Sequence, residues 1–503
     1  MNLTCDGPWT NQAALNLLGA NLDAQNIKHT LDHVNVLGDH VTVMLDGVHD
    51  VKLIRNTLSD MKILIDADGN KIEWKYIELL HKLQEEIGLK LANKISKQHV
   101  NWQKAKMSVR LAVQVFSRST AKALETLRKL GIEGFEGSEA TEKFIMIIND
   151  LFDSLNSRNV RGYGYSKPLY KDSAINTLRM MASAKSYICG LKHDVTNLLV
   201  VKGKRKTGFI GLLVGMETVQ TLYANLVEKD LLKYLSTYRL SQDHLEVFFS
   251  CVRARFGFNN NPTTREFSAT YAKLILHTGL KSFSINTNVI VQEDIVIPAA
   301  TGTLQSATAN VIETENLNQD DLEWIYQLKD QLSSTEYAVN VTILTYIAGY
   351  IQKVILGNNN TCGGRKEAIQ NQETVSCTLI NVKDIGSKLV KPCKDILTIV
   401  KIAEKIVVAK TKDRQFLCEQ NLLSKLSLLI LTVISEEYSD LFSSVATHDR
   451  NTAIGSHRYV LMKRVCVIFC SLRLKHFAKI HDINNNAVKV RKHLNKIILF
   501  NHQ

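Results

Sequence analysis

The stretch from residue 41 to residue 61 sets the strongest limit on the fold of this chain. It reads VTVMLDGVHDVKLIRNTLSDM, in which five apolar or β-branched residues precede Asp46. Beyond this point the apolar side chains of Val51, Ile54 and Leu58 recur at intervals of three and four residues. The short apolar run predicts a buried strand, and the later spacing predicts an amphipathic helix. A strand followed directly by a helix indicates an α/β fold in this part of the chain.

A second strand-and-helix pattern follows in residues 61–88, MKILIDADGNKIEWKYIELLHKLQEEIG. The Asp-Gly-Asn turn at 68–70 separates an apolar run from an amphipathic helix predicted at 74–87. From about 96 to 237 the strand signal fades, and segments such as TEKFIMIINDLFDSLNSRN repeat apolar residues at three and four. This spacing predicts an all-helical block in the middle of the chain.

The rest of the chain is expected to be mostly helical. Residues 285–317 are rich in Thr, Asn and Ala and have little periodicity, which predicts a linker or an irregular strand region. Helical spacing returns beyond this stretch and continues towards the basic C-terminus. Together these patterns favour an α/β plus α protein.

Composition narrows the class of protein. At 503 residues and 45% hydrophobic content, the chain is long enough for roughly two to four folded domains. It has no window of about 18 uninterrupted apolar residues, and its first residues lack a basic region before an apolar run, so neither a membrane span nor a secretion signal is expected. The nine cysteines are scattered with no CxxC pair, which indicates a reducing compartment.

The positive charge of the chain is unevenly distributed. The formal net charge is +13, and residues 449–503 hold eleven Lys and Arg against two Asp, so +9 of it lies there. A segment of this kind is a candidate for contact with a polyanion, because each neutralised phosphate releases condensed counterions. A solvated basic helical face is an equally good interpretation of the charge alone.

Two acids, Asp243 and Glu246, lie three residues apart in the segment SQDHLEVFFSCVRARFGFNNNPTTREF. On a helix, residues three apart share a face, so the two carboxylates are expected to point the same way. The same helix is expected to bury its apolar side chains, namely Leu245, Phe248, Phe249 and Val252. A bound metal ion would relieve the repulsion between the acids, and Arg253 is the alternative counter-charge. A DxxE pair alone is also typical of a solvated helix face.

Asp46 is the second candidate, because it ends the apolar run in VTVMLDG. Side chains at the carboxyl end of a buried strand emerge at the crevice where α/β enzymes often place metal ligands. His49, Lys52 and Arg55 follow at helical spacing and could meet a phosphate backbone. Asp46 is equally well placed to cap the helix that starts near His49, and on this motif alone that interpretation is favoured.

Several segments, taken in order along the chain, resemble one known family. They are TCDGPWTN, LDGVHDVKLIRNTL, DGNKIEWKYIELLHKLQ, FIMIINDLFDSLNSR, SQDHLEVFFSCVRARFGFNNNPTTREF, YIAGYI and SHRYVLMKRVCVIFCSLRLKHFAKI. The resemblance is to the P-element transposase family, including the THAP-domain transposases, and it runs from residue 1 to near 503. It implies a DDE-type DNA transposase of the nucleus, in which three carboxylates hold two Mg²⁺ or Mn²⁺ ions for attack on a phosphodiester.

The resemblance assigns roles to individual residues. Asp46 matches the second catalytic Asp of the family, Glu246 its catalytic Glu, and Asp243 the companion acid three residues earlier. The helical insertion resembles the guanine-nucleotide-binding domain of the family, in which Asp153 and Asn156 match the pair that reads guanine. The chain contains no GxxxxGK[ST] motif, so from the sequence alone these two are ordinary exposed helix positions and GTP binding rests on the resemblance.

Other features differ from the family or stay open. The family's first catalytic Asp, its zinc-binding THAP domain and its oligomerisation segment are expected to be missing, through truncation or because upstream exons carry them. Asp6 matches the TCDG motif and not the first catalytic Asp. Arg365 stands where a second Cys would follow Cys362, which speaks against a metal knuckle. The basic run KGKRK at 202–206 fits a contact to DNA or nucleotide as well as a solvated turn.

These interpretations give a domain order and a function. The expected domains begin with the first part of a ribonuclease-H-like core, without its first strand (1–95), and the helical insertion (96–237). The second part of the core with the DxxE helix (238–284), a linker (285–317) and a helical, basic C-terminal domain (318–503) follow. The expected function is DNA transposition, in a copy that has lost most of its activity with the first Asp. The alternative is a domesticated, non-catalytic protein that binds DNA or nucleotide; the oligomeric state is open.

Overall fold

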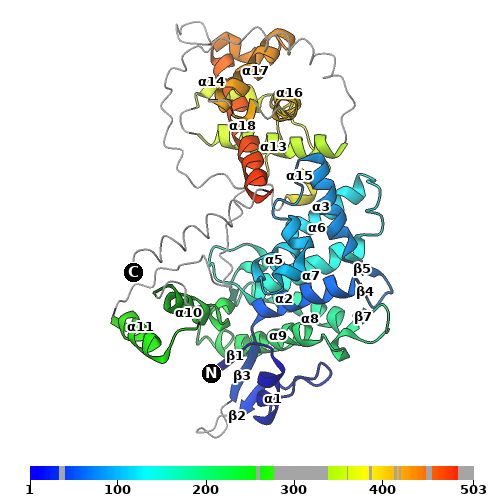
Figure 1. Ribbon diagram of the computed structural model, residues 1–503, viewed down its shortest axis with the longest axis vertical. Coiled ribbons are helices and arrows are strands. Elements are labelled where there is room, and N and C mark those ends of the chain that lie inside the picture. Colours follow the sequence, from blue (N-terminus) through cyan, green and yellow to red (C-terminus); the bar gives the residue numbers. More distant parts are fainter. Residues whose placement is uncertain are drawn as a thin grey trace. The chain divides into compact units, whose positions relative to one another are not determined.

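The computed structural model describes nine stretches of the chain, shown in Figure 1. They are residues 1–32, 40–255, 261–276, 338–358, 361–384, 388–412, 416–418, 421–448 and 456–484. The chain divides into two compact units, Met1–Glu293 and Asp294–Gln503, here called the first and the second unit. The linker expected at 285–317 lies outside the described residues, and the other domain boundaries stay predictions.

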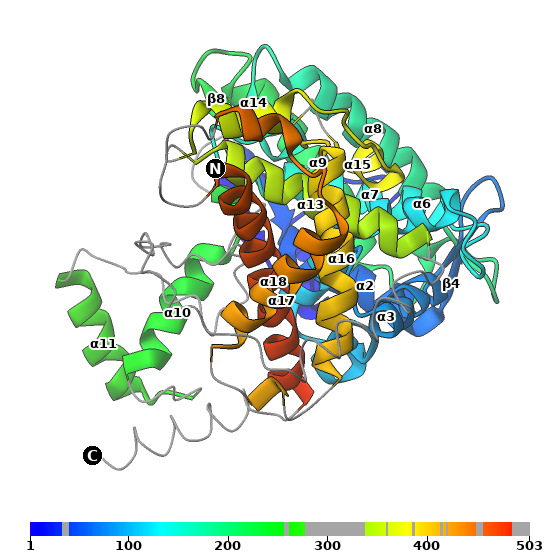
Figure 2. The ribbon, with the colours of Figure 1, turned by 90° about the horizontal axis from the view of Figure 1, so that it is seen from above.

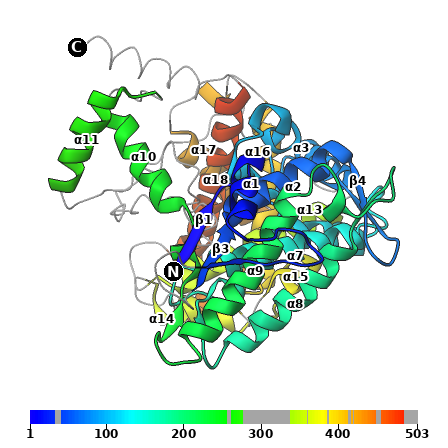
Figure 3. The same ribbon diagram turned by 90° about the horizontal axis from the view of Figure 1, so that it is seen from below.

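The first unit begins with a three-stranded sheet. Its strands are β1 (Asn2–Cys5), β2 (Thr30–Asp32) and β3 (His40–Leu45), in the order β1-β3-β2. Strand β1 runs parallel to β3 (Figure 3), with Cys5 opposite Leu45. Strand β2 runs antiparallel to β3. The strand predicted at 41–45 is therefore confirmed. Parallel pairing brings the carboxyl ends of β1 and β3 to the same edge of the sheet.

Helix α2 (Gly47–Met61) follows β3 directly, as the sequence predicts, and packs against α9 (Thr207–Leu226). The hydroxyl of Thr218 on α9 donates a hydrogen bond to the carbonyl of Val43 in β3. A Cβ on Gly208 would lie 2.7 Å from the carbonyl oxygen of Asp50, so α9 approaches the backbone of α2 closely at this glycine. Helix α9 is mostly apolar and buried and comes from the middle block, yet it completes the core beside β3.

A second small sheet lies in the same unit. Strand β4 (Ile63–Ile65) pairs antiparallel with β5 (Lys71–Glu73) and with β7 (Lys192–His193). Asp66 closes the turn between β4 and β5, where its carboxylate accepts the backbone N–H groups of Asp68 and Asn70 at 3.0 and 2.8 Å. Helix α3 (Lys75–Ile87) follows β5 and confirms the helix predicted at 74–87 to within one residue.

The middle block is mostly helical, but it is not all-helical as predicted. Its helices are α4 (Lys97–Val100), η1 (Trp102–Ala105), α5 (Val109–Val115), α6 (Arg118–Lys129), α7 (Glu139–Leu155), η2 (Gly164–Ser166), α8 (Ala174–Gly190), η3 (Val200–Lys202) and α9, followed by η4 (Thr237–Leu240). Strand β7 joins the second sheet, and β6 (Leu169–Tyr170) pairs with β8 (Tyr234–Leu235). Two-residue strands are too short to show the alternation from which strands are predicted.

Three further helices belong to the first unit. Helix α1 (Trp9–Leu17) lies near the start of its sequence, and α10 (Asp243–Arg255) and α11 (Thr264–Leu276) are the last helices described in it. The segment before α10 is tied to β1, because the hydroxyl of Thr4 donates to the carbonyl of Leu240 at 2.6 Å. Of the residues that α10 was expected to bury, only Val252 is fully buried; Leu245 is 54% and Phe249 is 44% exposed.

The ring of Phe248, also expected to be buried, is only partly covered. It packs edge-on against Phe267 and Tyr271 of α11, at centroid distances of 6.2 and 6.1 Å. Helix α10 thus forms a helical pair with α11 that leaves part of its apolar face in contact with solvent. The expectation of a fully buried apolar face is wrong, because the periodicity defines that face without showing what covers it.

The second unit consists of helices in the parts of it that the structure describes, as predicted. These are α13 (Ala338–Leu356), α14 (Gly363–Gln370), α15 (Thr378–Lys383), α16 (Lys394–Thr411), η6 (Phe416–Cys418), α17 (Leu422–Glu437), η7 (Ser443–His448) and α18 (His457–Asn484). Figure 2 shows α16, α17 and α18 packed side by side. By length and composition alone α13 could cross a membrane, but 56% of its apolar window is buried within the protein.

Gly349, within the motif YIAGYI on α13, makes a close backbone approach. A Cβ added there would overlap the carbonyl oxygen of Val390, in the segment that leads to α16. We expect Gly349→Ala to destabilise the second unit by about 1–3 kcal/mol, because backbone must move to admit the methyl group. The urea midpoint measures the effect, and Gly363→Ala at the start of α14, where a Cβ meets open space, is the matched control. Equal midpoints for the two variants would contradict the assignment of a packing role to this glycine.

Candidate active site

Asp6 and Asp46 emerge side by side at the carboxyl edge of the first sheet. They are the first residues after β1 and β3, whose last residues, Cys5 and Leu45, are register partners. Asp46 is 1% exposed, and its Oδ1 accepts the backbone N–H of Val48 at 3.1 Å, which caps α2. The capping role considered from the sequence is therefore present. It occupies Oδ1, while Oδ2 contacts the imidazole of His49.

His49, in the first turn of α2, bridges the two strand-end acids. Its Nδ1 lies 2.9 Å from Oδ2 of Asp46 and 2.9 Å from Oδ1 of Asp6. Burial opposes a charge on the imidazole, but the contacts with Asp46 and Asp6 outweigh it and raise the pKa of His49 to about 9. The contact with His49 in turn lowers the pKa of Asp6. One ligand atom from each of the three residues lies within 4.8 Å of the others.

The two acids of α10, Asp243 and Glu246, differ in how deeply they are buried beside the carboxyl edge of the first sheet. Asp243 is 1% exposed, and burial together with the negative charge of Asp46 raises its pKa to about 6, against the positive charges of Arg158 and His49. Glu246 is only partly buried, and its charge acts on Asp243 and on Lys52 of α2. The structure thus brings Asp243 and Asp46 together. In the described part of the chain, the group of ligand atoms close enough to share one ion contains Asp46 but neither acid of α10.

The basic residues of α2 do not form the phosphate-contacting face expected from the sequence. Arg55 is fully buried, where its Nη2 donates to the carbonyl of Ala105 at 3.0 Å and its Nε to Oδ1 of Asn56 at 2.8 Å. Lys52 is also buried, and burial lowers its pKa in spite of the surrounding acids. The expectation is wrong for Arg55, because its guanidinium instead fastens α2 to the segment around η1.

Asp153 and Asn156 lie at the end of α7 and are not the exposed helix positions expected from the sequence alone. Burial and the negative charge of Asp150 raise the pKa of Asp153 to about 7, while Nδ2 of Asn149 donates to its carboxylate at 3.2 Å. Asn156 is 9% exposed, and its buried Oδ1 has no hydrogen-bond partner among the described residues. Both residues are therefore polar groups in a poorly solvated place, and their pairing stays a prediction.

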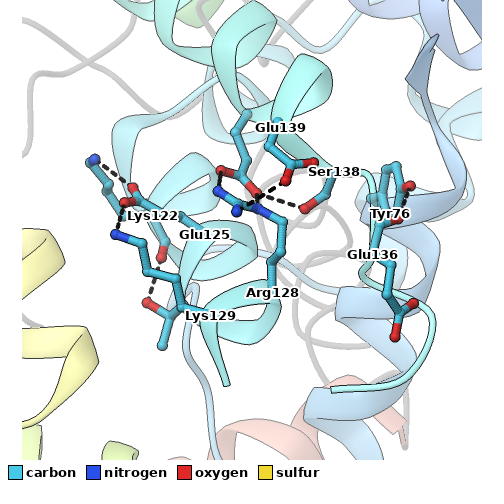
Figure 4. A network of polar contacts seen from close by, with 10 residues as sticks. Tyr76, Lys122, Glu125, Arg128, Lys129, Glu136, Ser138 and Glu139 are labelled. Atoms are coloured by element: carbon cyan, nitrogen blue, oxygen red, sulfur yellow. Dashed lines mark hydrogen bonds and ion pairs between the residues drawn. The ribbon is translucent and has the colours of Figure 1, made fainter. Parts of the chain in front are cut away.

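A pocket of about 420 Å³ opens at the other end of α7, and no motif in the sequence pointed to it. Its lining includes Lys71 of β5 and Glu139 and Lys143 of α7. Figure 4 shows Arg128 close to Glu139 and Ser138 in a network of polar contacts. Arg128 also pairs with Glu142, to which the hydroxyl of Ser138 donates a hydrogen bond. A helix of 17 residues separates its ends by roughly 25 Å. The pocket and the Asp153 region are therefore distinct places.

The remaining sequence candidates are the basic run at 202–206 in the first unit and the Cys362 region in the second. In the run at 202–206, Arg205 is paired with Asp60, and Lys202, Lys204 and Lys206 are exposed. In the second unit, Sγ of Cys362 lies 3.3 Å and Nε of Arg365 lies 3.4 Å from Nδ1 of His457. Cys362 and Arg365 thus approach the same imidazole nitrogen, and the doubt about a metal knuckle stays a prediction.

The basic C-terminal block is partly used inside the second unit. Arg473 is buried, with its Nη2 2.8 Å from Oε1 of Glu404, and Nε of Arg458 donates to the carbonyl of Leu441 at 2.6 Å. Lys475 is exposed, and residues 485–503 lie outside the described part of the chain. The +9 charge counted from the sequence therefore does not form one uniform solvated face on α18.

Comparison with known proteins places these features in a family. The model of the TNP-like GTP-binding insertion domain matches residues 48–168, that of the TNP-like RNase H C-terminal domain matches 238–272, and that of the C-terminal domain of DNA transposase THAP9 matches 329–479. Two relatives are DNA transposase THAP9 of Homo sapiens, 27% identical over 92% of this chain, and Transposable element P transposase of Drosophila melanogaster, 26% identical over 78% of it.

The chain spans about half the length of these relatives, 52% and 49% respectively. A solved structure, the Drosophila P element transposase strand transfer complex, resembles it at 28% identity and a TM-score of 0.47, over 56% of this chain and 61% of that one. The fold and the domain matches define a mixed α/β, helix-rich protein of the transposase-like class. The chain belongs to the P-element transposase-like family.

Proposed function

We propose that this chain forms part of a DDE-type DNA transposase that acts on DNA in the nucleus with Mg²⁺ or Mn²⁺. One observation carries the proposal. Asp46, at the end of β3, and Asp243, from a helix far later in the sequence, are buried close enough for the charge of one to raise the pKa of the other. Acids gathered in this way at a sheet edge are typical of a site that binds divalent cations. Glu246 lies one turn further along α10 and is proposed as the catalytic Glu.

The side chains present fit a divalent ion. Within the described part of the chain, the buried Oδ2 of Asp243 has no hydrogen-bond partner, and Oδ2 of Asp46 contacts His49. An ion held by Asp46, with Glu246 drawn in from its place outside the present ligand group, would polarise a water or a DNA 3′-hydroxyl for in-line attack on a phosphodiester. The N–H of Val48 fixes the Asp46 carboxylate in place beforehand. Lys52, buried among the acids, offsets part of their negative charge.

Guanine-nucleotide binding by the middle block is the second part of the proposal. It is supported by the match of residues 48–168 to a GTP-binding insertion domain and by the partly buried Asp153 and Asn156. A carboxylate that is shielded from solvent can accept hydrogen bonds from the N–H groups of a guanine ring, because few water molecules compete for it. The nucleotide would then act as a cofactor of the same protein rather than as the substrate of the acid site.

The test is a DNA cleavage and joining assay on the purified full chain with Mg²⁺ or Mn²⁺, with and without GTP. We expect weak but measurable nicking or joining by the wild type, and a fall to background in Asp46→Ala and in Glu246→Ala, because each change removes a proposed ion ligand. Asp172→Asn, an exposed acid between β6 and α8, is the control that should retain activity.

Two results would overturn the catalytic proposal. The first is the absence of products from the wild type with either ion, and the second is full activity in both alanine variants. Salt-sensitive DNA binding or GTP binding without any product would favour the non-catalytic binding protein instead, since phosphate contacts weaken with ionic strength whether or not chemistry follows.

A further inference from the structure

An aromatic and basic surface begins where the chain leaves α7. The segment from residue 158 to residue 171 reads RNVRGYGYSKPLYK, which holds three tyrosines and four basic residues and no acid. Tyr163, directly before η2, is 75% exposed, and Lys167, directly after η2, is also exposed. A ring as exposed as that of Tyr163 contributes little to the core of the protein, since it stays in contact with water.

The two-stranded ribbon of β6 and β8 continues this surface. Tyr170 of β6 is the register partner of Tyr234 of β8, and their ring centroids lie 5.1 Å apart. Nζ of Lys167 lies 5.0 Å from the centroid of the Tyr170 ring, as in a cation–π contact. Tyr234 is 37% exposed, and Lys233 next to it is exposed. Residues 158–171 and 233–235, here called the tyrosine surface, thus present aromatic rings and positive charge together.

The tyrosine surface is connected to the candidate active site. The guanidinium of Arg158, at its start, lies 4.3 Å from the centroid of the Tyr238 ring, and the positive charge of Arg158 acts on Asp243. The backbone N–H of Tyr238 donates to the carbonyl of Ser157 at 3.1 Å, which ties the segment after β8 to the end of α7. Helix α10, which carries Asp243, follows β8 and η4 along the chain. The surface is therefore continuous with the acid site through Arg158 and Tyr238.

We propose that the tyrosine surface binds single-stranded DNA, with bases stacked on Tyr163 and Tyr234 and phosphates held by Lys167 and Lys233. The flat face of any base can stack on an aromatic ring, but the bases of a duplex already stack on one another, so such a surface favours a single strand. The lysines supply the charge that a phosphate backbone requires, whereas protein interfaces are depleted in lysine. The inference rests on the proposed function for its choice of DNA, and it adds the form of the DNA and the residues that bind it.

The test measures binding of a fluorescent oligonucleotide of about 15 thymidines to the full chain by anisotropy, in EDTA and without any metal. We expect Tyr163→Ala and Tyr234→Ala each to weaken binding about 5-fold or more, because each removes a ring on which a base stacks. Tyr163→Phe should bind as the wild type does, since the ring is kept. Tyr438→Ala, at a tyrosine of the second unit that is also 37% exposed, is the matched control. Binding of a duplex of the same length should be equal in the wild type and the alanine variants.

The two lysines provide a second measurement, because each phosphate contact adds to the salt dependence of binding. We expect Lys167→Ala and Lys233→Ala each to reduce the slope of log Kd against log salt concentration by about 0.7. A purely structural role of these side chains would not change this slope. Far-UV circular dichroism and the urea midpoint show whether each variant is folded.

Three results would overturn the inference. They are the absence of oligothymidine binding by the wild type, unchanged binding in folded Tyr163→Ala and Tyr234→Ala, and tighter binding of oligouridine, which would assign the surface to RNA. DNA products combined with binding that does not depend on the tyrosines would refute this inference alone. Binding as expected, retained in Asp46→Ala but without DNA products from the wild type, would refute the catalytic proposal alone.

Discussion

Replacing Arg473 with Met is expected to lower the free energy of unfolding of the second unit by about 3–5 kcal/mol. Arg473 lies 3% exposed on α18, with its Nη2 2.8 Å from Oε1 and its Nε 2.7 Å from Oε2 of Glu404 on α16. Glu404 is itself 8% exposed. Removal of the guanidinium leaves a buried carboxylate without its counter-charge, and this penalty exceeds what the pair contributes when it is intact.

A double-mutant cycle separates the penalty for the unpaired charge from the loss of packing. We expect Glu404→Met alone to cost a similar amount, and the double variant Glu404→Met with Arg473→Met to lose less than either single change, since it leaves no unpaired charge. Lys475→Met, two residues along the same helix and exposed, should stay within about 0.5 kcal/mol of the wild type. Urea unfolding supplies all four values. Additive losses in the cycle would contradict the argument.

The local elements of the first unit could be predicted because their signals lie within a few residues of each other. The strand at 41–45 is a continuous apolar run, and the helix at 74–87 has clear three- and four-residue spacing. The position of α9 could not be predicted in this way. Its contact with β3 joins Thr218 to Val43, and no pattern in the sequence of either segment predicts this contact. Local periodicity describes a face, whereas the partner of that face depends on tertiary packing.

The same distinction explains what the sequence revealed of the candidate site. Asp46 could be found because it ends an apolar strand, a position defined by its own neighbours. The meeting of Asp6 with Asp46 depends on the parallel register of β1 and β3, which becomes known only once the strands pair. His49 was considered for its charge towards phosphate, yet it faces the two acids. Asp153 was expected to be exposed, since the apolar spacing of α7 does not reveal what packs around its end.

His99 is expected to make the first unit lose stability in mild acid. Burial lowers its pKa to about 4, and the positive charges of Arg55 and Lys90 act in the same direction. The hydrogen bonds of the His99 imidazole explain why its neutral form is favoured in the folded chain. Nε2 lies 3.1 Å from Oε1 of Gln114 and donates to it, so Nδ1 is left to accept the backbone N–H of Ser96, also at 3.1 Å. A second proton, on Nδ1, would break the contact with this N–H at the start of α4.

The sign and size follow from proton linkage. As the pH falls, the unfolded chain takes up a proton on His99 near its ordinary pKa of about 6.5, whereas the folded chain does so only near 4. Between these values the unfolded state binds more protons, so stability falls as the pH falls, by about 3 kcal/mol in total. Asp243 and Asp153, whose pKa values are raised to about 6 and about 7, act in the opposite direction over part of this range. The wild-type curve alone therefore mixes opposing contributions.

The difference between the wild type and His99→Gln isolates the contribution of His99, because the acids are common to both chains. Gln keeps an amide that can donate and accept but does not take up a proton in this range. We expect urea unfolding to show a stability advantage of the wild type that is largest near neutral pH and shrinks by about 3 kcal/mol towards pH 4. His40→Gln, at an exposed histidine of β3, should show a much smaller change with pH. A constant difference between wild type and His99→Gln would mean that His99 is protonated in the folded chain as readily as in the unfolded one, and that its bond from Ser96 does not hold it neutral.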